Sequence, residues 1–174
     1  RVLDSFVLPR SADFVSATAA LAAAATNDCR PDSPELRARW NAAMDAWLAV
    51  QDVRFGPIED QGRRLAIAYW PDADGFTPRA LRRIVTGAEP ALKRPETYAE
   101  VSVAARGLYA LETMLYDPRF AGFGPGDPGC ALVQAASADL AALAAEVDGG
   151  WTGGFADLMR SAGAPDNSRF LSPD

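Results

Sequence analysis

SVAARGLYALETMLYD, at Ser102–Asp117, carries apolar side chains at the spacing of one helix face. That face consists of Ala104, Leu108, Leu111 and Leu115. The opposite face consists of Arg106, Ala110, Thr113 and Asp117, and we expect it to be polar. The stretch therefore predicts an amphipathic helix, and with it a helical fold.

Glu112 lies at the edge between these two faces, with Tyr109 three residues before it and Tyr116 four residues after it. Residues at these spacings share one surface of a helix. A carboxylate between two phenols is a candidate binding site, but a solvated glutamate beside half-buried tyrosines has the same pattern. Gly107 stands about one turn earlier, where a helix interior favours alanine by roughly 1 kcal/mol. We therefore expect another group to approach the Gly107 backbone closely.

The composition is that of a globular, helix-rich domain. The 174 residues are 49% apolar and 23% charged, alanine is common, and runs of β-branched residues are scarce. A chain of this length forms one domain with a real core. The net charge of −6 argues against a nucleic-acid partner, because binding to phosphates needs basic side chains. No apolar run reaches the roughly eighteen residues of a membrane span, so we expect no transmembrane segment.

The sequence contains no histidine and only two cysteines. This excludes Ser-His-Asp and Cys-His catalysis, and any histidine-ligated zinc or iron site, within these residues. A metal could be held only by carboxylates, phenols, backbone carbonyls or the cysteines. Cys29 and Cys130 lie too far apart for a CxxC motif, and each stands next to an expected helix end. They form either a disulfide or two buried free thiols.

Four further stretches have helical patterns, and Ser33-Pro34 is a strong helix start. The predicted helices run from Ser11 or Asp13 to Asn27, from Pro34 to Val50, from Thr77 to Val85 and from Asp127 to Gly150, with one more from Trp151 to near Gly163. Gly87–Pro95 is expected to be a turn. Arg54–Gly75 is irregular, and the alternation of Leu65, Ile67 and Tyr69 is compatible with a short extended piece. The set predicts an all-α, four-helix-bundle-like domain with additional short helices and one long irregular loop.

Two stretches together resemble the imelysin-like family. The first has RFGPIE at Arg54–Glu59 and YWPD at Tyr69–Asp72, and the second, SVAARGLYALETMLY, stands in the place of the GxHxxE helix of the family. The positions of Cys29 and Cys130 also look like those of family members. The resemblance implies two similar four-helix bundles with the functional site at their interface. Residues 1–174 would form the N-terminal bundle, and the C-terminal bundle, absent from this chain, would be its partner.

The resemblance also implies a biological setting. It implies a bacterial, exported protein in the periplasm or on the outer envelope, linked to iron uptake, with envelope iron-transport components as further partners. The family was once classed among metallopeptidases, but the role now implied is non-enzymatic binding of a metal, a metal chelate or a partner. The chain starts at Arg1 rather than at methionine, as expected if a leader has been removed or if this is a segment of a longer product. Leu171–Asp174 reads like another helix start, so we expect the chain to be the front part of a longer protein.

One residue departs from the family motif at the decisive place. Gly107 and Glu112 match GxHxxE, whereas Tyr109 stands in the position of the histidine. A phenol can ligate ferric iron but is a poor substitute for imidazole toward zinc or ferrous iron. The candidate metal ligands are therefore Glu112 and Tyr109, for iron or another divalent metal. The candidate ligand-binding residues are Arg54, Asp72, Gly107, Tyr109 and Glu112.

Each of these interpretations has a structural alternative. Arg54 could cap carbonyls at the kink before Pro57, Asp72 could cap the turn that follows it, and Trp70 is expected to pack. The change at Tyr109 supports a further alternative function, a structural or interaction domain whose ancestral site has decayed. A metallohydrolase needs three protein ligands and an activated water, which a chain without histidine supplies poorly.

Overall fold

The computed structural model describes residues 2–87, 92 and 95–172, and every regular element in these ranges is helical. The α-helices are α1 (Leu8–Asn27), α2 (Pro34–Leu48), α3 (Arg63–Ile67), α4 (Phe76–Val85), α5 (Gly107–Tyr116), α6 (Pro128–Gly150) and α7 (Ala156–Arg160). Short 3-10 or π turns are η1 (Leu3–Val7), η2 (Gly56–Ile58), η3 (Asp60–Gly62), η5 (Pro95–Glu100), η6 (Val103–Ala105), η7 (Pro118–Phe120) and η8 (Trp151–Phe155). The predicted all-α class is confirmed.

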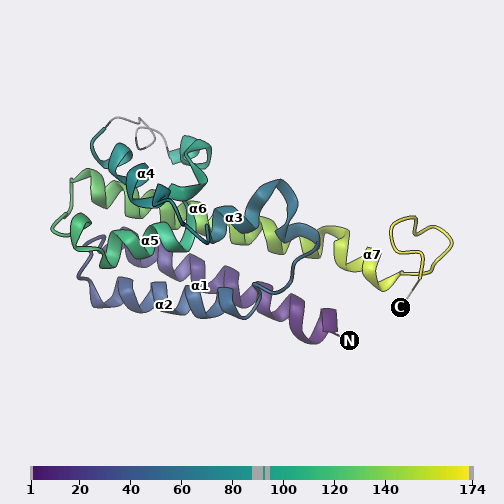
Figure 1. Ribbon diagram of the computed structural model, residues 1–174. Coiled ribbons are helices and arrows are strands. Elements are labelled where there is room, and N and C mark those ends of the chain that lie inside the picture. Colours follow the sequence, from purple (N-terminus) through teal and green to yellow (C-terminus); the bar gives the residue numbers. More distant parts are fainter. Residues whose placement is uncertain (1, 88–91, 93–94, 173–174) are drawn as a thin grey trace.

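The bundle is built on α1, α2, α5 and α6 (Figure 1). Helix α1 packs along both α2 and α6, and α5 packs on α6 and α2. The shorter helices α3 and α4 lie over α5 and α6 and leave α1 and α2 to the other side (Figure 1). The core is continuous, and its largest fully buried side chains include Trp151, Tyr98, Leu36 and Leu108.

Capping residues and prolines set the first residues of α1 and α2. Ser33 Oγ accepts a hydrogen bond from Leu36 N at 3.4 Å and Pro34 occupies the first turn, which confirms the predicted start of α2. Helix α1 starts at Leu8 rather than at Ser11 or Asp13, and η1 precedes it. The later start was wrong because Pro9 lies in the first turn, where its missing N–H leaves no helix bond unmade.

The segment between α2 and α4 is irregular as predicted, but it contains no extended piece at Leu65–Ile67. These residues belong to α3, which starts after Gly62 (φ +72). The alternation was misleading because Leu65 is exposed and Ile67 is fully buried, as on two sides of a single helical turn. The turn predicted at Gly87–Pro95 lies largely outside the described residues, as do Arg1 and the last two residues of Leu171–Asp174.

Helix α5 is shorter than its sequence pattern, because it begins at Gly107 and not at Ser102. Arg106 has an extended backbone that separates η6 from α5, and its guanidinium makes two bonds of 2.9 and 2.8 Å with the Asp139 carboxylate of α6. Ala110, expected on the polar face, is fully buried. The reason is that α5 is covered by α6 on one side and by α2 and α4 on others, so little of its circumference meets solvent.

Helix α6 ends at Gly150, as the Gly149-Gly150 pair predicted. The backbone of Trp151 is still helical, and the chain continues through η8 into α7. Gly150 also allows close packing, since a Cβ there would lie 2.6 Å from Pro57 Cβ. The run Pro128–Arg160 is long and apolar enough to cross a membrane by length and composition, although half of its most apolar window is buried inside the molecule. Core helices pass the same test, and α6 lies in the core of this bundle.

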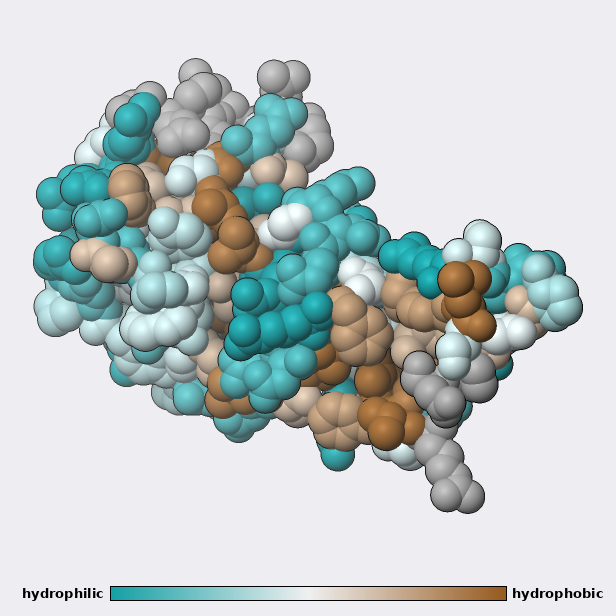
Figure 2. Space-filling view, turned by 45° about the vertical axis from the view of Figure 1, so that its right-hand side comes forward, coloured by the Kyte–Doolittle hydropathy of each residue, from teal (hydrophilic) through white to brown (hydrophobic). Residues whose placement is uncertain are grey.

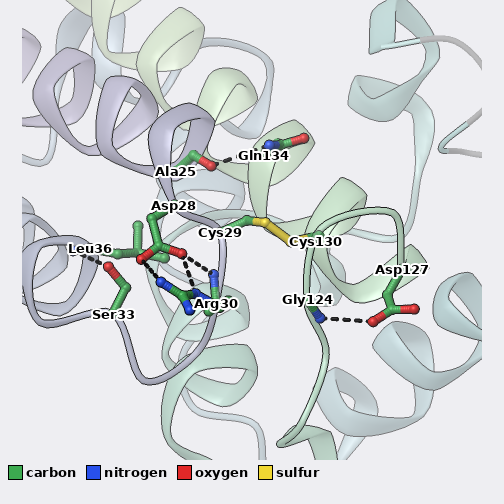
Figure 3. A network of polar contacts seen from close by, with 10 residues as sticks. All are labelled: Ala25, Asp28, Cys29, Arg30, Ser33, Leu36, Gly124, Asp127, Cys130 and Gln134. Carbon is green, nitrogen blue, oxygen red and sulfur yellow. Dashed lines mark hydrogen bonds and ion pairs between the residues drawn. A yellow bond between two sulfur atoms is a disulfide. The ribbon is translucent and has the colours of Figure 1, made fainter.

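Cys29 and Cys130 form a disulfide with a Cα–Cα distance of 5.1 Å (Figure 3). The bridge joins the segment after α1 to the first turn of α6. Of the two states that the sequence left open, the structure therefore has the bridged one. Around it the Asp28 carboxylate accepts bonds from the Arg30 side chain, and Gln134 Nε2 donates to Ala25 O (Figure 3).

Candidate functional site

Tyr109, Glu112 and Tyr116 lie along the one side of α5 that neighbouring helices leave partly open. Tyr109 and Glu112 are half-buried, and Tyr116 is exposed. The spacing in the sequence predicted this shared surface because α5 is a regular helix over these residues. We call this surface, with Trp70 added below, the α5 face.

Gly107 fixes the start of the α5 face by a contact that only glycine permits. Its φ is +73°, and a Cβ there would lie 2.1 Å from Ile67 O and 2.3 Å from Ala66 O. The expected close approach therefore comes from the last carbonyls of α3. Gly107 therefore allows the end of α3 and the segment that follows it to lie against the N-terminal end of α5.

The segment after α3 places Trp70 against Tyr109. The two rings have centroids 5.6 Å apart and planes inclined by 33°, and Trp70 is 68% exposed. The expectation that Trp70 packs is met only on one ring face, because the other side of the indole meets solvent. Sequence reasoning missed Trp70 as part of the site, although YWPD had been singled out as a motif.

Glu112 has no hydrogen-bond or ion-pair partner among the described residues, and burial raises the pKa of its carboxyl above the ordinary 4.5. A partly buried carboxylate without a compensating donor is costly. Its side chain stands one turn after Tyr109, and helix side chains lean toward the N-terminus. Glu112 and Tyr109 are therefore neighbours on the surface of α5.

Tyr116, at the other end of the α5 face, is already occupied by partners from this chain. The Arg37 guanidinium lies 4.7 Å from the Tyr116 ring centroid and donates to Leu115 O at 2.8 Å. Asn41 Nδ2 donates to Tyr116 Oη at 3.3 Å, and Trp40 packs edge-on against the ring. The two tyrosines of the α5 face thus have different neighbours. The Arg37 guanidinium lies on the Tyr116 ring, whereas the exposed Trp70 indole packs against the Tyr109 ring.

Asp72 and Arg54 lie in other surroundings. The Asp72 carboxylate accepts bonds from Phe76 N at 2.7 Å and Thr77 N at 2.8 Å, so both oxygens cap the start of α4. Burial acts to raise the pKa of Asp72, but the bonds from Thr77 and Phe76 outweigh it and lower that pKa. Arg54 is exposed, and no hydrogen bond or ion pair joins it to another described residue.

Apolar side chains are also exposed on another part of the surface. On the face drawn in Figure 2, apolar side chains gather mainly toward the end of the bundle where both termini lie. The exposed side chains Val2, Phe6, Phe55 and Leu158 belong to the elements of that end. Arg54 is the chain neighbour of Phe55, whose ring packs on Trp151, so it belongs to this end and not to the α5 face.

The donor set of the α5 face does not by itself form a metal centre. Nowhere in residues 2–87, 92 and 95–172 do three cysteine, aspartate or glutamate side chains gather as a metal site would require. Glu112 and Tyr109 are two oxygen donors on one helix, and the Asp72 oxygens are used in capping. These residues do not fit a resident metal ion held by this chain alone.

Two comparisons with known proteins indicate the same family. The Imelysin family model matches residues 7–172. A solved structure of an imelysin-like protein from Psychrobacter arcticum 273-4 superimposes with a TM-score of 0.80 at 27% sequence identity, covering 98% of this chain. This chain spans only 54% of that protein. A search of curated proteins gave no match.

Proposed function

This chain belongs to the imelysin family, and on that premise we propose that it is a helical-bundle half of a non-enzymatic cell-envelope protein linked to iron uptake. In this proposal it binds its ligand on the α5 face. The iron-uptake link and the periplasmic or outer-envelope location come from the family resemblance. The Cys29–Cys130 bridge supports the location, because disulfides persist in oxidising compartments.

The observation that carries the binding proposal is Glu112. It is half-buried, it has no partner among the described residues, and it stands beside Tyr109. Native proteins seldom retain such a group without a use, since replacing it would remove the cost of its burial. Glu112 occupies the position of the glutamate in GxHxxE, which adds the weight of the family motif.

A non-enzymatic role agrees with the donors at hand. A hydrolytic zinc site needs three protein ligands and an open position for water, whereas the α5 face offers one carboxylate and one phenol. An iron ion, an iron chelate or a partner would have to complete the contacts. The complementary groups would come from the chelator or from the second bundle that the family resemblance implies.

The replacement of the motif histidine by Tyr109 favours a second candidate function. In that reading the chain is a structural or interaction domain whose ligand site has been lost. The two readings differ in one observable: only the first predicts that a ligand stabilises this chain through Glu112.

The test is a titration of the purified 174-residue chain with ferric iron supplied as its nitrilotriacetate complex, followed by thermal unfolding and tryptophan fluorescence. The proposal expects a ligand-dependent rise of the melting temperature that disappears in Glu112→Ala. Glu100→Ala is the matched control, because Glu100 is an exposed glutamate outside the α5 face. A shift that persists in Glu112→Ala removes the α5 face from the role, and the absence of any shift favours the ligand-free domain.

A further inference from the structure

We infer that a groove between α4 and the segment that joins α5 to α6 binds a small organic anion, in which a carboxylate is attached to an apolar body. This α4 groove has a volume of about 330 Å³. Its lining comes from the end of α4, from Met114 of α5, from η7 and the loop after it, and from the first turn of α6. It lies away from the α5 face, because Met114 follows Glu112 by two residues and is turned by about 200° around the helix axis.

The charge of the α4 groove is opposite to that of the whole chain. The chain has a net charge of −6, whereas the residues that line the groove include two arginines, Arg82 and Arg119, and no aspartate or glutamate. Guanidinium groups bind carboxylates through paired N–H donors in a fixed geometry. The lining therefore favours an anionic ligand over a cationic or neutral one.

Both arginines have donors that no described residue uses. The Arg82 side chain makes no hydrogen bond or ion pair within the described part of the chain. Arg119 donates from Nε and Nη2 to the Asp117 carboxylate at 2.9 and 2.5 Å, and its Nη1 has no partner among the described residues. The bonds from Arg119 lower the pKa of the Asp117 carboxyl most, and the charge of Arg82 contributes to the same shift. One carboxylate is thus close to both guanidinium groups and neutralises only one of their two charges.

The remainder of the α4 groove is apolar. Met114 and Phe120 are buried, and Val85 and Phe123 are half-buried. Phe123 packs so closely on Gly129, in the first turn of α6, that a Cβ there would lie 2.6 Å from Phe123 Cγ. The volume is near the lower end of the range of ligand pockets, roughly 300–1,000 Å³. A compact ligand with an apolar body and one negative charge is the chemical complement of this lining.

The arginines of α4 also have a purely structural explanation, and it defines the control. Arg82 and Arg83 both lie in the last turn of α4, where positive side chains stabilise the helix dipole. Both are exposed, and neither has an ion-pair partner among the described residues. Of the two, only Arg82 lines the groove. Arg83→Gln therefore removes the same charge from the same helical turn as Arg82→Gln but leaves the groove intact.

Met114 provides the readout. The chain has three methionines, and only Met114 lines the groove, so Met44 and Met159 are internal controls. An aromatic ligand bound there should shift the nuclear magnetic resonance signal of the isotope-labelled Met114 methyl group. The probes are naphthoate, its uncharged isostere naphthamide, and inorganic phosphate, which is an anion without an apolar body. All are titrated into the 174-residue chain at constant ionic strength and neutral pH.

The inference expects a saturable shift of the Met114 signal with naphthoate, with a dissociation constant on the order of 1 mM. Naphthamide and phosphate should bind about tenfold more weakly. Arg82→Gln is expected to weaken naphthoate about fivefold, while Arg83→Gln leaves its affinity unchanged. The inference is overturned by the absence of a saturable shift, by naphthamide or phosphate binding as tightly as naphthoate, or by equal affinities in the two arginine variants.

This test is independent of the proposed function, because the α4 groove and the α5 face share no residue. Glu112→Ala should leave the affinity for naphthoate unchanged, and Arg82→Gln should leave the ferric iron titration unchanged. Loss of naphthoate binding in Glu112→Ala would overturn the inference of a separate groove. Failure of the ferric titration alone would overturn only the proposed function.

Discussion

The disulfide end of the bundle and the α5 face differ in whether a carboxylate has a partner within the chain. At the disulfide end, Asp28 accepts three hydrogen bonds from Arg30, and these bonds hold the pKa of Asp28 well below its usual range (Figure 3). On the α5 face, Glu112 has no partner among the described residues, and its pKa is raised by burial. Asp28 is thus paired within the chain, whereas no described residue pairs with Glu112.

This difference suggests separate roles: the disulfide end stabilises the chain, and the α5 face is available for binding. The bridge and its polar neighbours join α1 to α6, the two most extensively packed helices, and Arg30 pairs with the Asp28 carboxylate next to the bridge. The α5 face is placed by backbone contact at Gly107 and by ring stacking, so its carboxylate stays free. Sites that bind ligands commonly retain such locally unfavourable groups, because the ligand supplies the missing interaction.

The largest effect is expected where α3 meets α5. Gly107→Ala should destabilise the protein by about 5 kcal/mol or more, because the new Cβ meets two backbone oxygens that no rotamer change can move. Urea unfolding followed by circular dichroism measures this. Gly75→Ala is the matched control: Gly75 also has a positive φ, but nothing lies within 4 Å of an added Cβ. It should cost about 1–2 kcal/mol, and equal costs at the two sites would contradict the close approach.

The next effect concerns the disulfide end. Replacing Cys29 and Cys130 by serine should lower the free energy of unfolding by about 4–5 kcal/mol, because the bridge closes a long loop in the unfolded chain. The loss is measured by urea unfolding of three samples: wild type, wild type with reductant, and the double variant. Glu112-dependent binding of ferric iron in native conditions should be unchanged, since the bridge does not belong to the α5 face. A variant that keeps its stability but loses this binding would contradict the separation of the two regions.

The sequence predicted those features that depend on local chemistry. The all-α class, the Ser33-Pro34 start of α2 and the shared surface of Tyr109, Glu112 and Tyr116 follow from periodicity and capping. The close approach at Gly107 was also predicted from one glycine, but its partner was not, because α3 is far away in the sequence. The error at Ala110 has the same origin: this residue is buried against helices that are far away in the sequence, which periodicity does not encode.

The site was harder to predict than the fold, since it depends on which side chains stay unpaired. Arg106 was placed on a polar face, yet it is paired with the buried Asp139 carboxylate of α6. Asp72 was a candidate ligand, yet its oxygens cap α4. The exposure of Trp70 had no sequence signal, because a tryptophan beside a proline is equally compatible with a buried loop.

The smallest predicted effect is a gain in stability rather than a loss, and it tests the contrast between Glu112 and Asp28 most directly. Burial raises the pKa of Glu112 in the folded protein, so the charged form opposes folding above that pKa. Glu112→Gln should therefore stabilise the chain at pH 7, by less than about 1 kcal/mol because the group is partly solvated, or about 2 °C in melting temperature.

The pH dependence gives this prediction its sign. The penalty is fully present above the raised folded-state pKa, shrinks as the pH falls through it, and is gone well below the ordinary value of 4.5, where Glu112 is protonated in both states. Melting temperatures of wild type and Glu112→Gln should hence converge in acid and diverge toward neutrality, whereas Glu100→Gln should follow wild type throughout. Destabilisation by Glu112→Gln at pH 7 would mean that the carboxylate is satisfied within the chain, and the contrast with Asp28 would fail. If Glu112→Gln is more stable and also binds ferric iron less well, the chain retains Glu112 for its ligand and not for its fold.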